Sequence, residues 1–347
     1  MIKVIHIEGG LGNQMACYAV FVAAQESNPQ DDFYIDTYVY DVKESHSTIS
    51  MWNGYELEKI FGLKLRDIRS LFTPEQVNEQ LEYLKKSQFW KHDWNYAEVF
   101  IQMMKNYDIS LRNAYGRVIE MEKNLKTGLK YAVKKLMAES AKNKVVYQIK
   151  KIAYSLNNHV GADKGKYLYM VREGDYYYDI TLDFMKSAYL CNKLGERMRK
   201  DLAFDEPRDA YNKAMLEKVD SVNSISIHVR RTDYLQFNED CYKFGYFKKS
   251  VKYIKKHVEE PEFFVFSDDL DWCRSNIEVI GLTEMDDVTF VGINSEANSY
   301  RDMQIMSRCK HNISTKSSFG WWASFLNANA SKITCCQVGP YVCTKQF

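Results

Sequence analysis

The stretch SIHVRRTDYL at residues 226–235 joins a buried strand to a cluster of charged side chains. Its first half alternates β-branched residues, a composition that favours a buried strand. His228, Arg230, Arg231 and Asp233 then follow without a spacer. Uncompensated charge is costly in a core, so these side chains are expected to leave the sheet where the strand ends. Two guanidinium groups there can hold a diphosphate through bidentate hydrogen bonds. The alternative is a surface cluster of ion pairs.

Strands alternate with helices on the C-terminal side of this stretch. We expect strands over 263–266, 288–291, 311–314 and 332–336, with helices over 245–258, 298–309 and 317–327. This alternation predicts a parallel, doubly wound α/β sheet, whose ligands bind beyond the carboxyl ends of the strands.

Two further polar motifs fall where these strands end. Ser267-Asp268-Asp269 offers a carboxylate that can accept two adjacent N–H bonds from guanine, although the same residues can simply cap a helix. Ser317 and Ser318 precede a helix whose first N–H groups suit a phosphate. Asp269-Leu270-Asp271 matches a metal-binding pattern of some sugar transferases. Because it falls inside the expected helix, we predict no metal site.

The N-terminal half opens with a short strand at 4–7 and the glycine-rich turn EGGLGNQ at 8–14. An apolar helix is expected over 15–25. Strand, turn and helix N-terminus together predict an anion or sugar site. The alternative is a dinucleotide site with Asp36 as the ribose ligand, but its third glycine is replaced by Met15.

A short helix over 56–63 is expected to end at Gly62, and 73–115 is helical in pattern. Residues 121–157 carry nine Lys against two Glu. Their apolar residues fall at helical spacing, which predicts a solvated helix or, about 121–151, a basic helix on an anionic membrane. A helix over 190–205 leads to a boundary at Glu206-Pro207. We therefore expect domains over 1–207, with a helical insertion about 73–185, and 208–347.

Composition narrows the class of protein. The 347 residues suit two domains, and a net charge of +1 gives no reason to expect nucleic acid as a partner. Eight Cys without a C-x-x-C pair indicate reduced thiols. No apolar run approaches the ~20 residues of a membrane span. We expect a cytoplasmic protein, with the basic helix as a peripheral contact at the inner face of the membrane.

Taken together, the motifs resemble those of the bacterial α-1,2-fucosyltransferases, glycosyltransferase family eleven. The resemblance rests on GGLGNQM at 9–15, YELEKIFGL at 55–63, HVRRTDYL at 228–235 and SSFGWW at 317–322, with a looser match of FFVFSDDLDWC at 263–273. The family usually has Phe-Gln-Tyr after the first motif, where this chain has Ala-Cys-Tyr at 16–18. This departure and others fall on the acceptor side, so the resemblance predicts the donor more closely than the acceptor or linkage.

The resemblance implies a GT-B-like fold, with two Rossmann-like doubly wound domains facing a cleft, and inverting transfer of fucose from GDP-fucose. It implies an oligosaccharide or lipid-linked glycan acceptor, as in the synthesis of bacterial surface polysaccharide, and no cofactor. The donor-binding residues would be His228, Arg230, Arg231, Asp268, Asp269, Ser317, Ser318 and Phe319, with Arg230 on the β-phosphate. Gly10, Asn13 and Gln14 would lie on the fucose or acceptor side.

Arg230 is the first catalytic candidate, because a guanidinium stabilises the charge that builds up on a GDP leaving group. Asp233 or Glu239 is expected to accept the proton of the acceptor hydroxyl, and the sequence does not choose between them. A transferase of another linkage that uses a GDP-sugar, and a non-catalytic glycan- or sugar-nucleotide-binding protein on the same fold, are the alternatives.

Overall fold

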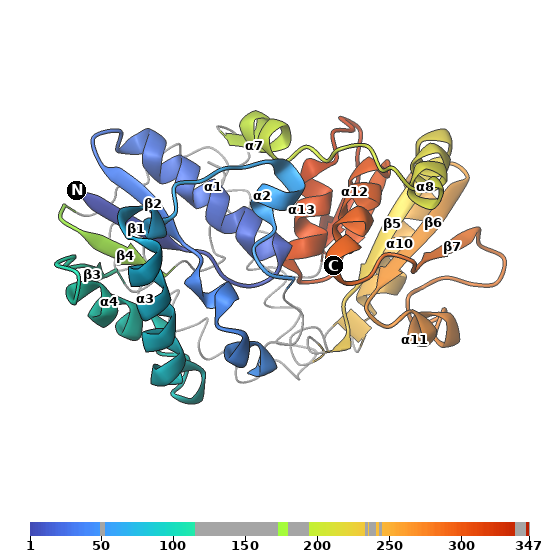
Figure 1. Cartoon of the computed structure of the whole chain (residues 1–347). Coiled ribbons are helices and arrows are strands. Elements are labelled where there is room, and N and C mark those ends of the chain that lie inside the picture. The colour runs from blue at the N-terminus through green and yellow to red at the C-terminus, as the bar shows by residue number, and fades with distance from the viewer. Residues whose placement is uncertain are drawn as a thin grey trace, which may run out of the picture. The chain divides into compact units, whose positions relative to one another are not determined.

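The computed structural model describes residues 1–48, 53–114, 173–179, 194–232, 235, 241–242, 245–336 and 345–346. These residues form two compact units: those up to Asp205 belong to unit 1, and those from Glu206 to unit 2. Each unit contains one parallel sheet with helices packed around it (Figure 1). The expected α/β fold with two parallel sheets is confirmed.

The sheet of unit 1 has the strand order β2-β1-β4-β3. Its strands are β1 (Ile2–His6), β2 (Asp32–Asp36), β3 (Arg112–Asn113) and β4 (Tyr176–Tyr178). The helix α1 (Leu11–Ser27) follows β1 directly and is buried on nearly all sides over its first fourteen residues, as its apolar composition predicts.

The remaining helices of unit 1 begin and end at recognisable sequence signals. Gly62 ends α2 in the left-handed conformation (φ 66°), as the sequence predicts. Thr73 and Gln76 form a capping box at the start of α3. The helices are α2 (Leu57–Phe61), α3 (Pro74–Ser87), α4 (Tyr96–Lys105) and α7 (Gly195–Asp201), and the 3₁₀ turns are η1 (Tyr38–Asp41), η2 (Lys43–Thr48), η3 (Ile68–Leu71) and η4 (Phe89–Lys91).

Unit 2 contains a larger sheet with the strand order β10-β9-β8-β5-β6-β7. Its strands are β5 (Asn223–Val229), β6 (Pro261–Ser267), β7 (Val288–Val291), β8 (His311–Ser314), β9 (Thr334–Cys336) and β10 (Lys345–Gln346). Its helices are α8 (Ala210–Ser221), α10 (Tyr246–His257), α11 (Leu270–Ser275), α12 (Tyr300–Arg308) and α13 (Ser318–Leu326), with the 3₁₀ turn η8 (Glu296–Asn298).

The strand order contains one topological switch point in each described sheet. In unit 2 the chain builds from β5 to β6 and β7, then returns to the other side of β5 to add β8 and β9. In unit 1 the chain passes from β1 to β2, and later strands are added on the other side of β1. Ligands of open parallel sheets bind beyond the carboxyl ends of the strands at such points.

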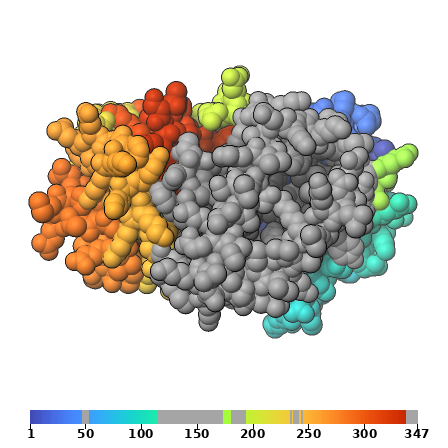
Figure 2. All heavy atoms as spheres, turned by 180° about the vertical axis from the view of Figure 1, so that it is seen from behind, coloured from blue at the N-terminus to red at the C-terminus, as the bar shows by residue number. Residues whose placement is uncertain are grey.

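The two faces of the β5 region differ in chemistry because side chains alternate along a strand. Ile225, Ile227 and Val229 pack into an apolar core with Phe247 and Ile254 of α10. The outward face of α10 carries exposed lysines, Lys248, Lys252, Lys255 and Lys256 among them, and lies within the gold surface of Figure 2.

The other face of β5 is polar and lies toward the helices α8 and α12. Ser224 donates to the backbone oxygen of Val219 in α8. Asn312 of β8 donates both to Ser226 and to the backbone oxygen of Met306 in α12. A buried hydrogen-bond network therefore holds this face in register, and it leads to His228 at the end of the strand.

None of the described helices is long and apolar enough to cross a bilayer. The cysteines that the structure describes are buried and form no disulfide, namely 17, 241, 273, 309, 335 and 336. The basic segment 121–157 and most of the insertion about 73–185 lie outside the described residues.

Two glycines with positive φ angles in unit 2 allow a direct test of backbone packing. A Cβ on Gly281 (φ 84°) would lie 2.8 Å from the Cα of Lys248, whereas a Cβ on Gly245 (φ 68°) would meet no atom within 4 Å. We expect Gly245→Ala to lower the free energy of unfolding by about 1–2 kcal/mol, the ordinary cost of the left-handed conformation. Gly281→Ala should cost clearly more. Urea unfolding measures both, and equal costs would contradict the close approach.

Candidate functional site

The charged motif leaves the sheet where β5 ends, as expected. The side chain of Arg230 is 20% exposed, and its Nη1 lies 3.2 Å from Oδ2 of Asp268. The backbone oxygen of Arg230 accepts a hydrogen bond from the hydroxyl of Tyr242 at 3.1 Å. A charged planar group is therefore held at the carboxyl end of the central strand, with part of its surface open to solvent.

Arg231 turns toward the protein. Its Nε donates to Oδ2 of Asp269 at 3.0 Å, and its guanidinium carbon lies 3.5 Å from the ring centroid of Trp272. The side chain is 14% exposed. This ion pair and cation–π contact fix the position of Arg231, so the two neighbouring arginines have different environments.

The Ser267-Asp268-Asp269 turn ties the end of β6 to the end of β5. Ser267 donates to the backbone oxygen of Val229 at 2.7 Å, and Asp268 accepts from the backbone N–H of Arg231 at 2.8 Å and from the hydroxyl of Thr232. Asp269 caps α11 by accepting from the N–H of Trp272 at 3.2 Å. Both carboxylates are thus engaged within the protein, and the helix-capping alternative describes Asp269.

His228 is the last inward-facing residue of the polar face of β5. Burial, and then the charge of Arg230, lower the pKa of His228 to about 4, so the imidazole is neutral at pH 7. Its Nδ1 is buried without a hydrogen-bond partner. A Cβ on Gly320 would lie 2.5 Å from that Nδ1, and the ring of Phe319 lies 5.8 Å away between centroids. Only glycine fits at position 320 while the ring keeps this position.

The turn after β8 lies next to the end of β5, because His228 pairs with Ser314 in the parallel register. Ser317 is the N-cap of α13 without a side-chain capping bond, and it is nearly buried. The hydroxyl of Thr315 is buried without a partner. Ser318 is the first residue of α13 and is partly exposed. The switch point of unit 2 therefore brings Arg230, His228 and the hydroxyls of this turn to one edge.

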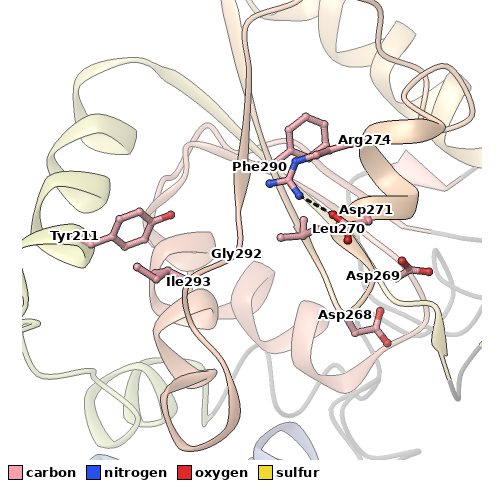
Figure 3. A pocket seen from close by; sticks show the side chains of 9 residues that line it. All are labelled: Tyr211, Asp268, Asp269, Leu270, Asp271, Arg274, Phe290, Gly292 and Ile293. Carbon is pink, nitrogen blue, oxygen red and sulfur yellow. Dashed lines mark hydrogen bonds and ion pairs between the residues drawn. The ribbon is translucent and has the colours of Figure 1, made fainter.

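A hollow of about 560 Å³ opens beside this edge, beyond β6 and β7 (Figure 3). Asp268 and Asp269 line one side, and Tyr211 of α8 and Ile293 line the other. The full lining is Tyr211, Asp268, Asp269, Leu270, Asp271, Arg274, Phe290, Gly292 and Ile293. Its mixture of aromatic and acidic groups suits a flat, hydrogen-bonding ring better than an anion.

Near this hollow lies a carboxyl group that the sequence analysis did not single out. Asp302 of α12 accepts from the amide of Asn294 at 2.7 Å, and Asn294 exchanges hydrogen bonds with Asn212 of α8. Burial raises the pKa of Asp302 to about 7. No local signal marks this residue, because its partners come from a loop and a helix that only the fold brings together.

In unit 1 the glycine turn is shorter than expected, because α1 begins at Leu11 and already contains Gly12, Asn13 and Gln14. Gly9 has a φ of 81°, and a Cβ there would lie 2.5 Å from Nδ2 of Asn13. Gln14 is fully buried, and its amide bonds to the backbone of Gly9, Gly54 and Glu56. Its contribution is therefore to fix the turn. Gly10 and Asn13 are partly exposed.

The dinucleotide alternative is wrong for Asp36. This carboxylate is fully buried and bonds to His6, Tyr96, Tyr177 and the N–H of Tyr38, so no ribose can reach it.

Asp233 and Glu239 lie outside the described residues. Among the residues that the structure does describe, no group of three or more His, Cys, Asp or Glu side chains is placed to hold a metal ion. Within the D-x-D pattern, Asp271 points to solvent and pairs with Arg274 at 3.2 Å. Its neighbour Asp269 is the cap of α11.

The raised pKa of Asp302 gives a prediction for stability against pH. Between about pH 4 and 7 the folded state keeps the proton that the unfolded state loses, so this group makes stability fall as pH rises through that window. Asp302→Asn removes the titration and keeps an oxygen for Asn294. We expect the melting temperature of the variant, relative to that of the wild type, to increase as the pH rises from 5 to 8. The control is Asp271→Asn, a fully exposed carboxyl, and an equal response of both variants would contradict the assignment.

Comparisons with known proteins come from three directions. The model of "Glycosyl transferase family 11" matches residues 118–338, which is more than half of the chain. "Galactoside alpha-(1,2)-fucosyltransferase 1" of Homo sapiens is 35% identical over 107 residues, 29% of this chain and 28% of that protein. "Alpha-1,2-colitosyltransferase" of Escherichia coli is 35% identical over 119 residues, 33% of this chain and 40% of that protein.

The chain thus spans well under half the length of these curated relatives. The fucosyltransferase NodZ from Bradyrhizobium superposes with a TM-score of 0.41 and 12% identity, covering 93% of this chain and 91% of that one. The family match includes the motifs that follow β5, β6 and β8, at 228–235, 267–269 and 317–322, together with the helices around them. On that match, the chain belongs to glycosyl transferase family 11.

Proposed function

We propose that the protein is an inverting glycosyltransferase that moves fucose from GDP-fucose to a hydroxyl of a galactoside acceptor. The carrying observation is the part-exposed guanidinium of Arg230 at the switch point of unit 2. It lies beside the start of α13 in a member of family 11. We propose 208–347 as the donor-binding domain and 1–207 as the acceptor-side domain.

The diphosphate of the donor fits this edge by charge and by hydrogen bonding. Arg230 can donate to two phosphate oxygens while a third N–H stays on Asp268. The hydroxyls of Ser317 and Ser318 and the N-terminus of α13 add uncharged donors. Since His228 is neutral at pH 7, it can present one N–H and one acceptor to the nucleotide.

In the transfer step, the acceptor oxygen forms a bond to the anomeric carbon as the bond from that carbon to the β-phosphate oxygen breaks. GDP leaves with the bonding electron pair, and Arg230 stabilises the charge that develops on it. The acceptor hydroxyl gives its proton to a carboxylate, for which Asp233 within the motif and Glu239 shortly after it are the candidates. Attack from the face opposite GDP inverts the configuration.

Our proposal for the acceptor and the linkage rests on the names of relatives whose similarity covers about a third of the chain. An α-1,2 linkage to a galactoside is the first candidate. A further candidate acceptor is a lipid-linked glycan for surface polysaccharide, which the protein would reach at a membrane through the basic segment 121–151. Transfer of colitose is a second candidate activity, favoured by the matched segment of the Escherichia coli enzyme. A transferase of another linkage would keep the same donor site.

Donor choice is tested by ligand-induced stabilisation. GDP should raise the melting temperature by mass action, whereas UDP and ADP at the same concentration should not. Transfer is then followed as GDP release from GDP-fucose and GDP-colitose, with and without a galactose-terminated acceptor. We expect activity to persist in excess EDTA. Equal stabilisation by the three nucleotides would contradict a guanine site, and loss of turnover in EDTA restored by manganese would show a metal requirement.

The two arginines should respond differently to substitution. Arg230→Lys keeps the charge but loses the bidentate geometry, so kcat should fall about 10²- to 10³-fold at unchanged melting temperature. Arg231→Ala removes the contacts to Asp269 and Trp272 and should lower the melting temperature as well as kcat. Measuring kcat and melting temperature for both variants separates the roles. A normal kcat in Arg230→Lys would remove the phosphate clamp from the mechanism.

A further inference from the structure

A chain of charged side chains in unit 1 has no part in the donor chemistry described above. His6, the last residue of β1, is nearly buried between two carboxylates. Its Nδ1 lies 3.0 Å from Oδ2 of Asp36, and its Nε2 lies 3.3 Å from Oε2 of Glu8. Glu8 follows the end of β1 and begins the glycine turn. The row of charged side chains Asp36–His6–Glu8 therefore leads from the core to the edge of the sheet.

At the buried end of this row, the carboxylate of Asp36 is fully hydrogen-bonded. Asp36 accepts from the hydroxyls of Tyr96 at 3.0 Å and Tyr177 at 2.8 Å, and from the N–H of Tyr38 at 3.0 Å. Burial by itself lowers the pKa of His6, but the bonds to Asp36 and Glu8 outweigh it and raise that pKa to about 10. The imidazole is therefore a cation at neutral pH, held by an ionised Asp36.

The other end of the chain is open. The side chain of Glu8 is 35% exposed, and its Oε2 accepts from the indole N–H of Trp94 at 3.0 Å. Trp94 (φ 54°) and Asp93 (φ 49°) both adopt the left-handed conformation to deliver that indole. Aspartate tolerates this conformation, but it is unfavourable for a bulky residue such as Trp94, so the contact to Glu8 is maintained against a local cost.

The position of Glu8 in the topology is that of a ligand-binding group. It follows β1 at the switch point of the sheet, with β2 on one side and β4 on the other. A Cβ built on Gly10, two residues later, would meet no atom within 4 Å, so the turn beside Glu8 is unobstructed. Asp179, which follows β4, is exposed at the same edge.

Stability alone does not account for this arrangement. Apolar residues of similar volume usually replace a buried ion pair without loss of stability, because desolvation offsets the attraction. An ion pair between His6 and Asp36 alone would also not require Glu8, a second carboxylate that is partly exposed to solvent. The His6 cation, fixed between the two carboxylates, does keep Glu8 ionised and in one orientation.

We propose that Glu8 is the proton acceptor for the acceptor hydroxyl in sugar transfer, with His6 and Asp36 as its positioning residues. The inference rests on the proposed transferase function and takes the place of Asp233 and Glu239 as base. As the acceptor oxygen bonds to the anomeric carbon and GDP departs, the hydroxyl proton passes to the free oxygen of Glu8. Product release and exchange with water return the carboxylate to its ionised form.

Glu8→Gln is the first test, because glutamine keeps the size of the side chain and an oxygen for Trp94. We expect kcat for transfer to fall about 10²- to 10⁴-fold, the usual contribution of a general base. The stabilisation by GDP should be unchanged, and the KM for the acceptor should change only a few-fold. The matched control is Glu98→Gln, an exposed carboxylate of α4 in the same unit, which should keep full activity. Asp233→Asn and Glu239→Gln are measured alongside.

The positioning role is tested by the double variant His6→Gln with Asp36→Asn, which leaves no unpaired buried charge. The titratable groups that face Glu8 are His6 of β1, Asp36 of β2, Asp179 after β4, Cys17 of α1 and Tyr40 of η1. Among them the His6 cation lowers the pKa of Glu8 most, and Asp36 raises it only slightly. Losing both should raise the pKa of Glu8, so the acid limb of the kcat/KM profile should move to higher pH. A purely structural pair would lower stability without moving that limb.

The outcomes separate the inference from the function beneath it. A wild type that transfers sugar neither to an acceptor nor to water overturns the proposed function, and the base with it. An active wild type whose Glu8→Gln variant keeps near-normal kcat overturns the base alone. Loss of the GDP response in Glu8→Gln would likewise overturn it, because the defect would then be one of folding.

Discussion

Two successive arginines at the end of one strand meet two successive aspartates at the end of the next. This ladder, Arg230 with Asp268 and Arg231 with Asp269, closes the carboxyl edge of β5 and β6. Without the aspartates, two neighbouring cations would repel each other at the low-dielectric end of a sheet. With them, Arg231 is held on the ring of Trp272, and the side chain of Arg230 stays 20% exposed at the edge of the sheet. The rest of unit 2 can be understood as the scaffold that brings β6, β8 and their turns to this ladder.

The two histidines His228 in unit 2 and His6 in unit 1 have opposite protonation states, because their charged neighbours differ. In unit 2 a neutral imidazole lies beside a cation, and both burial and the nearby charge keep the proton off His228. In unit 1 the imidazole lies between two anions, and its proton is retained far above neutral pH. The same side chain is therefore a neutral hydrogen-bonding group in one sheet and a permanent charge in the other, and the difference comes entirely from its neighbours.

Much of this architecture follows from local sequence. The strands at 288–291 and 311–314 have the predicted bounds, because each is a short β-branched or polar run between clear turn signals. The helix α8 and the strand β4 were not predicted: α8 is only weakly amphipathic, and β4 is three tyrosines whose partner strands lie far away in the sequence. The motif at 228–231 predicted an emergent charge cluster but not its pairing, since Arg231 and Asp269 are brought together by parallel strands. Asp302 and His6 had no sequence signal. From the sequence we considered the turn that contains Glu8 and also Asp36, but could not predict that both bond to His6, because these contacts depend on partners from several elements.

The contact between Gly320 and His228 also limits how this chain can diverge. With less room than a methyl group needs between the α13 backbone and the imidazole, the two positions are mutually constrained. Any side chain at 320 requires first a smaller or displaced residue at 228, and a smaller residue at 228 opens a void that favours a larger one at 320. A side chain at position 320 is therefore expected to be tolerated only where the residue at 228 is smaller or displaced.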